Sequence, residues 1–335
     1  MSYTIKDVAK RANVSIATVS RILNNKSGFS EKTKRKVLQA IEELGYHPNA
    51  IARGLINKNT ETIGVLIPAV SNMFSSEILD GIEKYANDIG SSVIVCNTAD
   101  DGERTMKYLQ VLSEKRVDGI IIVSESIEEE YHKALTDMKI PVVLVSTLSF
   151  EYPFPYVKVD DRHAAFSATD YLIKKGHKKI AMLSGNAEDL IAGLPRMEGF
   201  KSALRAHRLP INEDNIIDCR GFSYKDGVSG MEEILRRELD ITAIFASSDE
   251  LAAGAMSIAY KHGIKIPEQL SIIGYDNTKL AEMTIPSLTV VAQPLFDMGL
   301  MAATMLFEMK ETGEITESRI MKHEIIERET VISQH

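Results

Sequence analysis

A helix-sized segment beginning at residue 16 carries side chains that can read the edges of DNA base pairs. Ile16, Ala17 and, one turn later, Arg21 face away from the apolar side of this predicted helix. Small apolar groups can contact the thymine methyl group, and an arginine can donate two hydrogen bonds to guanine O6 and N7. The pattern therefore predicts a recognition helix for the major groove of double-stranded DNA.

The residues before this helix predict the turn and the cap that position it. Ile5, Val8 and Ala9 recur at helical spacing, which predicts a first helix with one apolar face. Asn13 falls in the turn, where a positive φ is needed and asparagine tolerates one. Ser15 can cap the second helix by accepting a backbone N–H from its first turn. Residues 4–24 thus predict a helix-turn-helix, the alternative being an ordinary packed pair of helices.

A third helix and a short linking segment complete the predicted N-terminal part. The third helix should begin after Ser30 as its N-cap and end near Gly45, with Val37, Ile41 and Leu44 on its apolar face. Residues 50–57 can form a helix but are too few to be stable alone. We expect a DNA-binding head over residues 1–46, a hinge helix and linker over 47–60, and a body over 61–335.

The charge of the chain is divided unevenly. The net charge of the 335 residues is −8, but residues 1–60 carry +7 and the remainder carries −15. A basic segment attracts a polyanion, whereas an acidic one repels it. The charge distribution therefore supports DNA binding by the head independently of the helix pattern.

From residue 62 onward, apolar strand-like runs alternate with amphipathic helical stretches. Continuous β-branched runs separated by helices predict parallel sheets covered on both faces. Two sets of five runs predict an α/β fold with two doubly wound parallel-sheet lobes and a ligand cleft where the strand carboxyl ends face each other. The expected strands span residues 62–67, 92–97, 119–123, 142–146 and 156–159, then 179–183, 216–219, 243–246, 271–275 and 288–291.

The composition argues against membrane and secreted classes. No apolar run approaches the roughly eighteen residues that a membrane span requires. The N-terminus lacks an apolar signal segment. Cys96 and Cys219 are too few for a disulfide framework or a metal site, so we expect two core residues and a cytoplasmic protein.

The sequence also lacks the common enzyme motifs. The turn after Ile67 has no G-x-G-x-x-G, and neither a phosphate-binding P-loop nor a nucleophile elbow occurs. The acidic runs at residues 100–101 and 128–130 are expected to be solvated carboxylates. We expect no catalytic residues, cofactor or metal.

Several motifs together resemble the LacI/GalR family of bacterial transcription regulators. They are residues 4–24 and 46–55, Gly-His-Lys-Lys-Ile at 176–180, Ile-Ile-Gly-Tyr-Asp-Asn at 272–277 and Ile-Pro-Ser-Leu-Thr at 285–289. The resemblance implies a homodimer that reads a pseudo-palindromic operator, and a body that resembles periplasmic sugar-binding proteins and binds an effector. It implies one lobe of residues 61–160 with 292–322 and another of 161–291 with 323–335.

The resemblance also implies which residues contact DNA. The head most resembles the catabolite control protein branch, which implies an operator with a central CG step. Leu55 matches the hinge-helix leucine inserted into the minor groove, where an apolar wedge can bend the duplex. The implied contacts are Thr4, Ser15, Ile16, Ala17, Thr18, Ser20, Arg21, Asn24, Asn49, Ala52 and Leu55.

In the body, the resemblance implies an effector site. Arg196 and Asp276 match paired ligands that can hold sugar hydroxyls by charge-assisted hydrogen bonds. His177 is expected to be a turn residue rather than a ligand. The implied effector residues are Asn72, Phe74, Arg196, Phe222, Ser248, Asp276 and Gln293.

Departures from the family pattern bear on the effector. Leu190 and Ala192 lack the polar groups of purine-responsive members, and Ser248 replaces an asparagine frequent in sugar-responsive ones. Ile285 stands where catabolite control proteins carry an arginine, and Arg196 where they tend to have lysine. We therefore expect a repressor of a carbohydrate-utilisation operon that responds to a small sugar or sugar phosphate. Two alternatives stay open: a regulator whose corepressor is a phosphorylated phosphocarrier protein, and a free-standing sugar-binding protein.

Overall fold

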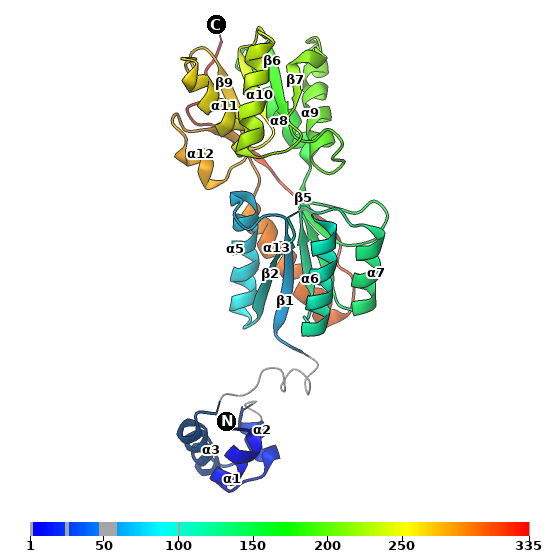
Figure 1. Cartoon of the computed structure of the whole chain (residues 1–335), viewed down its shortest axis with the longest axis vertical. Helices are drawn as coiled ribbons and strands as arrows, with labels where there is room; N and C mark the ends of the chain where they lie inside the picture. Colours follow the sequence, from blue (N-terminus) through cyan, green and yellow to red (C-terminus); the bar gives the residue numbers. More distant parts are fainter. Residues whose placement is uncertain (1–2, 24–26, 47–58, 100, 335) are drawn as a thin grey trace. The chain divides into compact units, whose positions relative to one another are not determined.

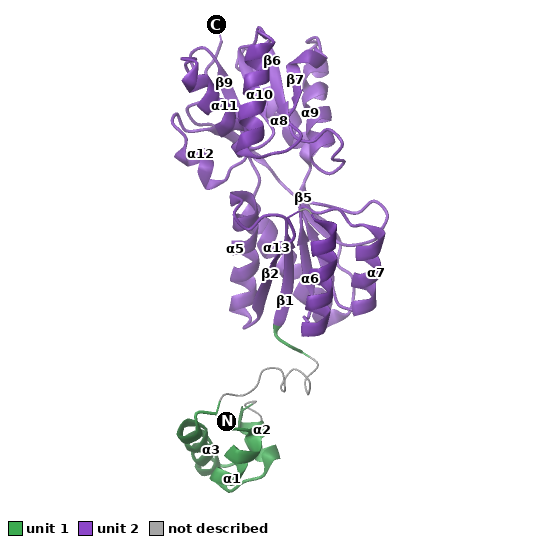
Figure 2. Cartoon of the chain, in the orientation of Figure 1, with its two compact units in different colours: residues 1–61 green, residues 62–335 purple. Residues whose placement is uncertain are grey.

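The structure of the protein, a computed structural model, describes residues 3–23, 27–46, 59–99 and 101–334. The chain divides into two compact units, residues 1–61 and residues 62–335 (Figure 2). None of the described helices is long and apolar enough to cross a membrane.

Among its described residues, the first unit contains three helices around a small apolar core: α1 (Ile5–Ala12), α2 (Ile16–Leu23) and α3 (Glu31–Leu44). Val8, Val19 and Val37, one from each helix, are fully buried. Asn13 has φ 53°, so the predicted left-handed turn between α1 and α2 is confirmed. The Ser30 hydroxyl accepts the backbone N–H of Thr33 at 3.2 Å, so the predicted cap of α3 is confirmed too.

The second unit contains two six-stranded sheets, each covered by helices on both faces (Figure 1). We call them the first and second lobes. The first lobe has the strand order β11-β5-β4-β3-β1-β2. Its strands are β1 (Thr62–Ile67), β2 (Ser92–Asn97), β3 (Ile120–Val123), β4 (Val142–Val145), β5 (Tyr156–Val159) and β11 (Arg319–Met321), and its helices are α5 (Met73–Asp88), α6 (Gly102–Lys115), α7 (Glu129–Met138) and α13 (Leu295–Thr312).

The second lobe has the matching order β12-β10-β9-β8-β6-β7. The pairs are parallel in both sheets except for β10 with β12. Its strands are β6 (Ile180–Ser184), β7 (Ile216–Asp218), β8 (Ala243–Ala246), β9 (Ser271–Asp276), β10 (Thr289–Ala292) and β12 (Glu324–Ile326), and its helices are α8 (Asp161–Lys174), α9 (Gly193–Ala206), the short 3₁₀ helix η1 (Glu213–Asn215), α10 (Tyr224–Arg236), α11 (Asp249–Lys261) and α12 (Lys279–Met283).

The chain passes between the two lobes three times. It leaves the first sheet after Val159, returns to the first lobe after Ala292 and crosses again after Met321. In doubly wound sheets, ligands bind beyond the carboxyl ends of the strands where the strand order reverses. Both sheets reverse their order between their first and third strands, so each lobe presents such an edge.

All ten strands expected from the sequence are present, with ends that differ by at most one residue. The strands expected at 119–123, 142–146, 179–183, 216–219, 271–275 and 288–291 are observed at 120–123, 142–145, 180–184, 216–218, 271–276 and 289–292. Strands β11 and β12 were not expected from the sequence, because each is a three-residue edge strand with exposed or half-buried side chains and so lacks a buried apolar run.

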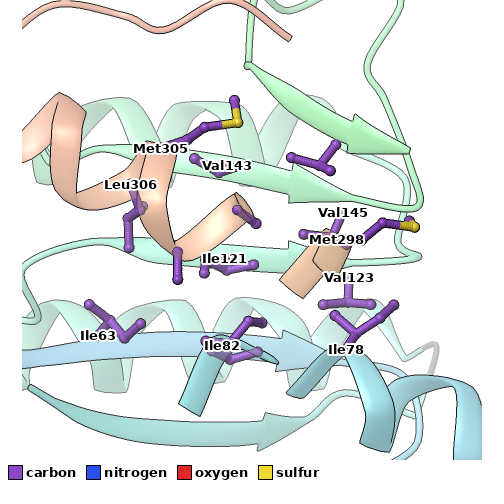
Figure 3. Close-up of a cluster of buried hydrophobic side chains, with 14 of the residues drawn as sticks. Ile63, Ile78, Ile82, Ile121, Val123, Val143, Val145, Met298, Met305 and Leu306 are labelled. Carbon is purple, nitrogen blue, oxygen red and sulfur yellow. The ribbon is translucent and has the colours of Figure 1, made fainter. Parts of the chain in front are cut away.

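In the first lobe, α5 and α13 cover one face of the sheet, and their buried side chains meet those of the strands (Figure 3). The two helices approach so closely that glycine is required at their contact. A Cβ atom at Gly81 would lie 2.0 Å from the carbonyl oxygen of Phe296, and one at Gly299 would lie 2.0 Å from that of Ile78. Backbone packed on backbone makes α5 and α13 a stiff pair.

We expect Gly81→Ala to lower the free energy of unfolding by about 1–3 kcal/mol, because the added methyl group must push the two helices apart. In an unconstrained helix the same change would instead be favourable by about 1 kcal/mol. Urea unfolding followed by circular dichroism measures the difference. Ser76→Ala, at an exposed position of α5, serves as the control, and a stabilised Gly81 variant would contradict the close contact.

Candidate DNA interface and effector site

The exposed face of α2 carries the residues expected to read bases. Val19 and Ile22 are buried in the head core, whereas Ile16 is 45% exposed and Ala17 and Arg21 are exposed. The helix therefore presents two apolar groups and a guanidinium to its surroundings, which is the chemistry needed to contact thymine methyls and guanine edges.

Other predicted DNA contacts hold the helix N-termini in place. The Ser15 hydroxyl accepts the backbone N–H of Thr18 at 3.1 Å, so the predicted cap of α2 is confirmed. The Ser15 and Thr18 hydroxyl oxygens lie 2.9 Å apart. The backbone N–H and the hydroxyl of Thr4 both donate to Asp7 Oδ2, at 2.8 and 2.7 Å, and these bonds lower the pKa of Asp7. Ser20 is half-buried on α2.

Four further predicted DNA contacts lie outside the residues that the structure describes. They are Asn24, Asn49, Ala52 and Leu55, so the expected hinge helix also lies outside the described residues.

In the second lobe, five of the predicted effector residues converge on the carboxyl edge of the sheet. Asp276 ends β9, Gln293 follows β10, Ser248 follows β8, and Arg196 lies in the first turn of α9. These four are buried, between 4% and 6% exposed. Phe222 follows β7 and is half-buried. The lobe thus gathers a cation, a carboxylate, an amide and an aromatic ring in one place.

The Arg196 guanidinium is held on three sides. Its Nε donates to Asp161 Oδ1 at 2.8 Å, and its Nη1 donates to the carbonyl oxygen of Ser247 at 2.7 Å. Its Cζ lies 3.9 Å from the ring centre of Tyr275 and 5.4 Å from that of Phe222. Although burial opposes the charge, Asp161 keeps the pKa of Arg196 above its ordinary value.

Asp276 lies in a strained turn and is held by an amide. Gln293 Nε2 donates to Asp276 Oδ1 at 2.7 Å. Asp276 has φ 115° and Asn277 has φ 66°, conformations that cost a non-glycine residue energy and are typical of functional sites. Burial raises the pKa of Asp276 to about 7, even though the nearby Arg196 charge lowers it.

A second buried carboxylate, Asp249, supports the same turn. Asp249 Oδ2 accepts the backbone N–H of Thr278 at 2.7 Å and its hydroxyl at 3.0 Å. Burial and the neighbouring Asp276 raise the pKa of Asp249 well above its ordinary value. The turn after β9 is therefore fixed at both Asp276 and Thr278.

Ser248 and Phe222, the remaining predicted effector residues of the second lobe, make contacts that hold their own segments in place. Ser248 accepts the backbone N–H of Leu251 at 3.0 Å and donates to the carbonyl oxygen of Phe222 at 2.7 Å, so it caps α11 and anchors the Phe222 loop. A Cβ atom at Gly185 would lie 2.1 Å from the Phe222 ring, so glycine leaves room for that ring.

Asn72 and Phe74, the other two predicted effector residues, belong to the first lobe and not to the second-lobe cluster. Asn72 Oδ1 accepts the backbone N–H groups of Phe74 at 2.7 Å and Ser75 at 3.4 Å, which caps α5. Phe74 packs partly buried against the first-lobe core. Their described contacts are thus with α5 and that core.

His177 is a turn residue, as expected. It is buried between α8 and β6, where its ring nitrogens lie 3.0 Å from the Thr242 hydroxyl and 3.1 Å from the carbonyl oxygen of Ile332. Cys96 and Cys219 are buried free cysteines, also as expected. Over the described ranges, no group of three or more His, Cys, Asp or Glu side chains could hold a metal ion.

The sequence analysis did not identify four polar residues of this cluster: Lys158, Asp161, Tyr275 and Asp249. One signal was available, since Lys158 interrupts a short apolar strand, and a lysine at such a position needs a buried partner. For Asp161, Tyr275 and Asp249, the chain pattern alone does not distinguish a site residue from a helix-start or core residue.

Comparisons with known proteins cover almost the whole chain. The family profile described as "Bacterial regulatory proteins, lacI family" matches residues 4–49, and that described as "Periplasmic binding proteins and sugar binding domain of LacI family" matches residues 60–329. Over 314 residues, the chain is 40% identical to catabolite control protein A of Priestia megaterium, spanning 93% of this chain and 94% of that protein.

Two further relatives support the comparison. The chain is 41% identical over 334 residues to the HTH-type transcriptional regulator RegA of Clostridium acetobutylicum, covering 98% of this chain and 99% of that one. The structure of the Lac repressor dimer bound to operator and the anti-inducer ONPF matches with a TM-score of 0.87 and 25% identity, covering 99% of this chain and 100% of that one.

We expect Asp276→Asn to flatten the decrease in stability between about pH 4 and pH 7. The folded protein retains the Asp276 proton up to about pH 7, whereas an unfolded aspartate loses it near pH 4. This contribution to stability is therefore complete below pH 4 and is lost as the pH rises through 7, by at most about 1.4 kcal/mol per pH unit. Asparagine has no such proton and can still accept the Gln293 hydrogen bond.

Urea unfolding of both proteins at pH 5 and pH 8 checks this expectation. Relative to wild type, the Asp276→Asn variant should gain stability at the higher pH. Asp240→Asn, which changes a carboxylate that is 79% exposed, controls for a general charge effect. A difference that is the same at both pH values would contradict the buried, protonated carboxyl group.

Proposed function

This chain belongs to the LacI family of bacterial regulatory proteins, and from that premise we propose that it represses a carbohydrate-utilisation operon under the control of a small sugar-like effector. It is a DNA-binding transcriptional regulator with a ligand-binding body. We propose that it acts in the cytoplasm and without catalysis.

Two heads of a homodimer would read a pseudo-palindromic operator with a central CG step. The exposed Ile16, Ala17 and Arg21 of α2 support this role, because they have the chemistry of base readout and no part in the head core. Residues 47–60 would form the hinge helix and linker, with Leu55 inserted at the operator centre. The net charge of +7 over residues 1–60 supports contact with phosphates.

The buried Arg196 and Asp276 carry the proposal of a sugar effector. A guanidinium has five N–H donors, of which Asp161 and Ser247 engage two. Gln293 engages one oxygen of Asp276. Donors and a carboxylate in one place suit vicinal hydroxyl groups, which donate and accept, and the neighbouring Phe222 offers an apolar ring face.

Control of DNA binding would follow from a change in lobe geometry. An effector that binds one arrangement of the lobes more tightly shifts the population toward it. In a dimer, that shift would alter the spacing of the two hinge helices and hence the operator affinity.

A phosphorylated phosphocarrier protein is the second candidate for the controlling ligand. The 40% identity to catabolite control protein A favours it. Ile285 opposes it, because this position is an apolar side chain that is 95% exposed where that branch carries an arginine for an anionic partner. The match of residues 4–49 to the regulator head removes the free-standing sugar-binding protein from consideration.

A thermal-shift panel of mono- and disaccharides, their phosphates and the phosphorylated phosphocarrier protein tests the ligand class. A hit is then tested for its effect on operator binding. Stabilisation by a sugar that also changes operator affinity supports the proposal, whereas a response to the phosphocarrier protein alone would replace it with the second candidate.

Arg21→Ala should weaken operator binding by about 1–3 kcal/mol per half-site, because it removes a bidentate contact to a guanine. Non-specific binding should fall much less, because many phosphate contacts supply it. Gel-shift titrations against the operator and a scrambled duplex at one salt concentration separate the two. Lys10→Ala, also an exposed charge of the head, is the matched control, and equal losses on both duplexes for Arg21→Ala would contradict base readout.

Arg196→Lys should abolish the thermal shift caused by the sugar while leaving operator affinity without sugar within about two-fold, since independent sites are usually nearly additive. The lysine retains a positive charge for Asp161 but lacks the planar fork of donors that a diol requires. Isothermal titration with the sugar and gel shifts without it measure the two properties. Loss of operator binding in the absence of sugar would contradict this role.

A further inference from the structure

Besides the three crossing segments, polar contacts of Lys158 and Lys279 connect the two lobes. Lys158 Nζ, on β5 of the first lobe, lies 3.1 Å from the carbonyl oxygen of Ile191 in the second lobe. The backbone N–H of Lys279 in the second lobe donates to Glu77 Oε1 on α5 at 3.2 Å. The first contact lies next to Arg196.

Lys158 is a buried charge whose position requires an explanation. Its side chain is 8% exposed, and its neighbours Val157 and Val159 belong to the first-lobe core. Burying an ammonium group is costly unless partners compensate it, and an apolar residue often serves as well or better. Here Lys158 Nζ lies 3.1 Å from Asp161 Oδ2, so the lysine is held by a carboxylate and a carbonyl group together.

Asp161 joins this lysine to the effector arginine. Its Oδ2 faces Lys158, and its Oδ1 accepts hydrogen bonds from Arg196 Nε at 2.8 Å and from the Tyr275 hydroxyl at 3.2 Å. One carboxylate is therefore shared between a cation of the first lobe and a cation of the second. Because both cations share this carboxylate, movement of one cation changes how strongly the carboxylate holds the other.

The carbonyl group that Lys158 contacts belongs to a loop that is held by hydrogen bonds. The Asp189 carboxylate accepts the backbone N–H groups of Ile191, Ala192 and Gly193 at 2.8, 3.3 and 3.1 Å. The carbonyl oxygen of Ala192 in turn accepts the backbone N–H of Arg196 at 3.0 Å. A displacement of Ile191 would therefore also displace the start of α9, which carries Arg196.

We propose that Lys158 is a positioning residue that ties β5 of the first lobe to the Arg196 loop of the second lobe, through Asp161 and the Ile191 carbonyl group. The tie holds the lobe arrangement of the protein without effector. If Arg196 binds the effector, which is the proposed function, a ligand that draws Arg196 away from Asp161 alters the tie and so the angle between the lobes.

The distance between the lobes, measured without effector, tests this proposal. Gln110→Cys on α6 and Ser229→Cys on α10 place spin labels at exposed positions of the two lobes. Burial raises the pKa of the native Cys219 thiol to about 12 and also raises that of Cys96, so neither competes for the label at neutral pH. The labelled full-length protein is mixed with excess unlabelled protein, and pulsed electron paramagnetic resonance gives the distribution of distances.

Lys158→Met should broaden this distribution and shift its mean, because the thioether fills the space but binds neither Asp161 nor Ile191. Lys158→Arg should restore a narrow distribution, since a guanidinium can bind both. Lys310→Met is the matched control: it removes the pair between Lys310 and Asp118, 2.9 Å apart within the first lobe, and should leave the distance unchanged.

Three results would overturn the proposal: an unchanged distribution in Lys158→Met, the same broadening in Lys310→Met, or no recovery in Lys158→Arg. If Lys158→Met does not fold, Lys158→Gln is measured instead. It retains a donor for the Ile191 carbonyl group but no charge for Asp161, and it should broaden the distribution too. Because no sugar is present, failure of Lys158 as a tie is distinguishable from failure of Arg196 as an effector ligand.

Discussion

The polar cluster of the second lobe depends on the pairing of Arg196 with Asp161. Arg196 is only 6% exposed, and a buried guanidinium cannot be retained without a counter-charge. Asp161 supplies it at 2.8 Å, and the faces of Tyr275 and Phe222 close the site around the cation. Two further charged residues lie around this pair. Lys158 contacts the second oxygen of Asp161, and the charge of Arg196 offsets part of the rise that burial causes in the pKa of Asp276.

The candidate effector site is therefore only partly satisfied by its own groups: Asp161 and Ser247 engage two of the five donors of Arg196, and Gln293 engages one oxygen of Asp276. A ligand that binds Arg196 or Asp276 can use the donors and the acceptor that these partners do not engage, and a typical net gain is about 0.5–1.5 kcal/mol for each hydrogen bond. The strained turn at Asp276 and Asn277 is held by Gln293 and by Asp249 through Thr278.

Much of this arrangement was predictable because it repeats locally along the chain. Apolar runs and helix caps are encoded within a few residues, so the ten main strands, the Asn13 turn and the caps at Ser15 and Ser30 were identified. The edge strands β11 and β12 were not, since three residues with exposed or half-buried side chains carry no periodic signal. Family resemblance indicated Arg196 and Asp276, but the partners Asp161, Lys158 and Asp249 lie 35, 38 and 27 positions from them in the sequence, and only the folded chain brings them together.

The effector of this regulator is harder to predict from the sequence than its DNA contacts. Base readout depends on side chains that project from one exposed helix, and a single segment encodes their types and spacing. The proposed effector site instead combines groups from α9, β9 and the residue after β10, whose hydrogen-bond partners decide which donors face a ligand. A typical coupling between two sites is about 1–3 kcal/mol, equivalent to one or two such hydrogen bonds. If Arg196 and Asp276 bind the effector as proposed, one or two hydrogen bonds gained there would supply a coupling of this size.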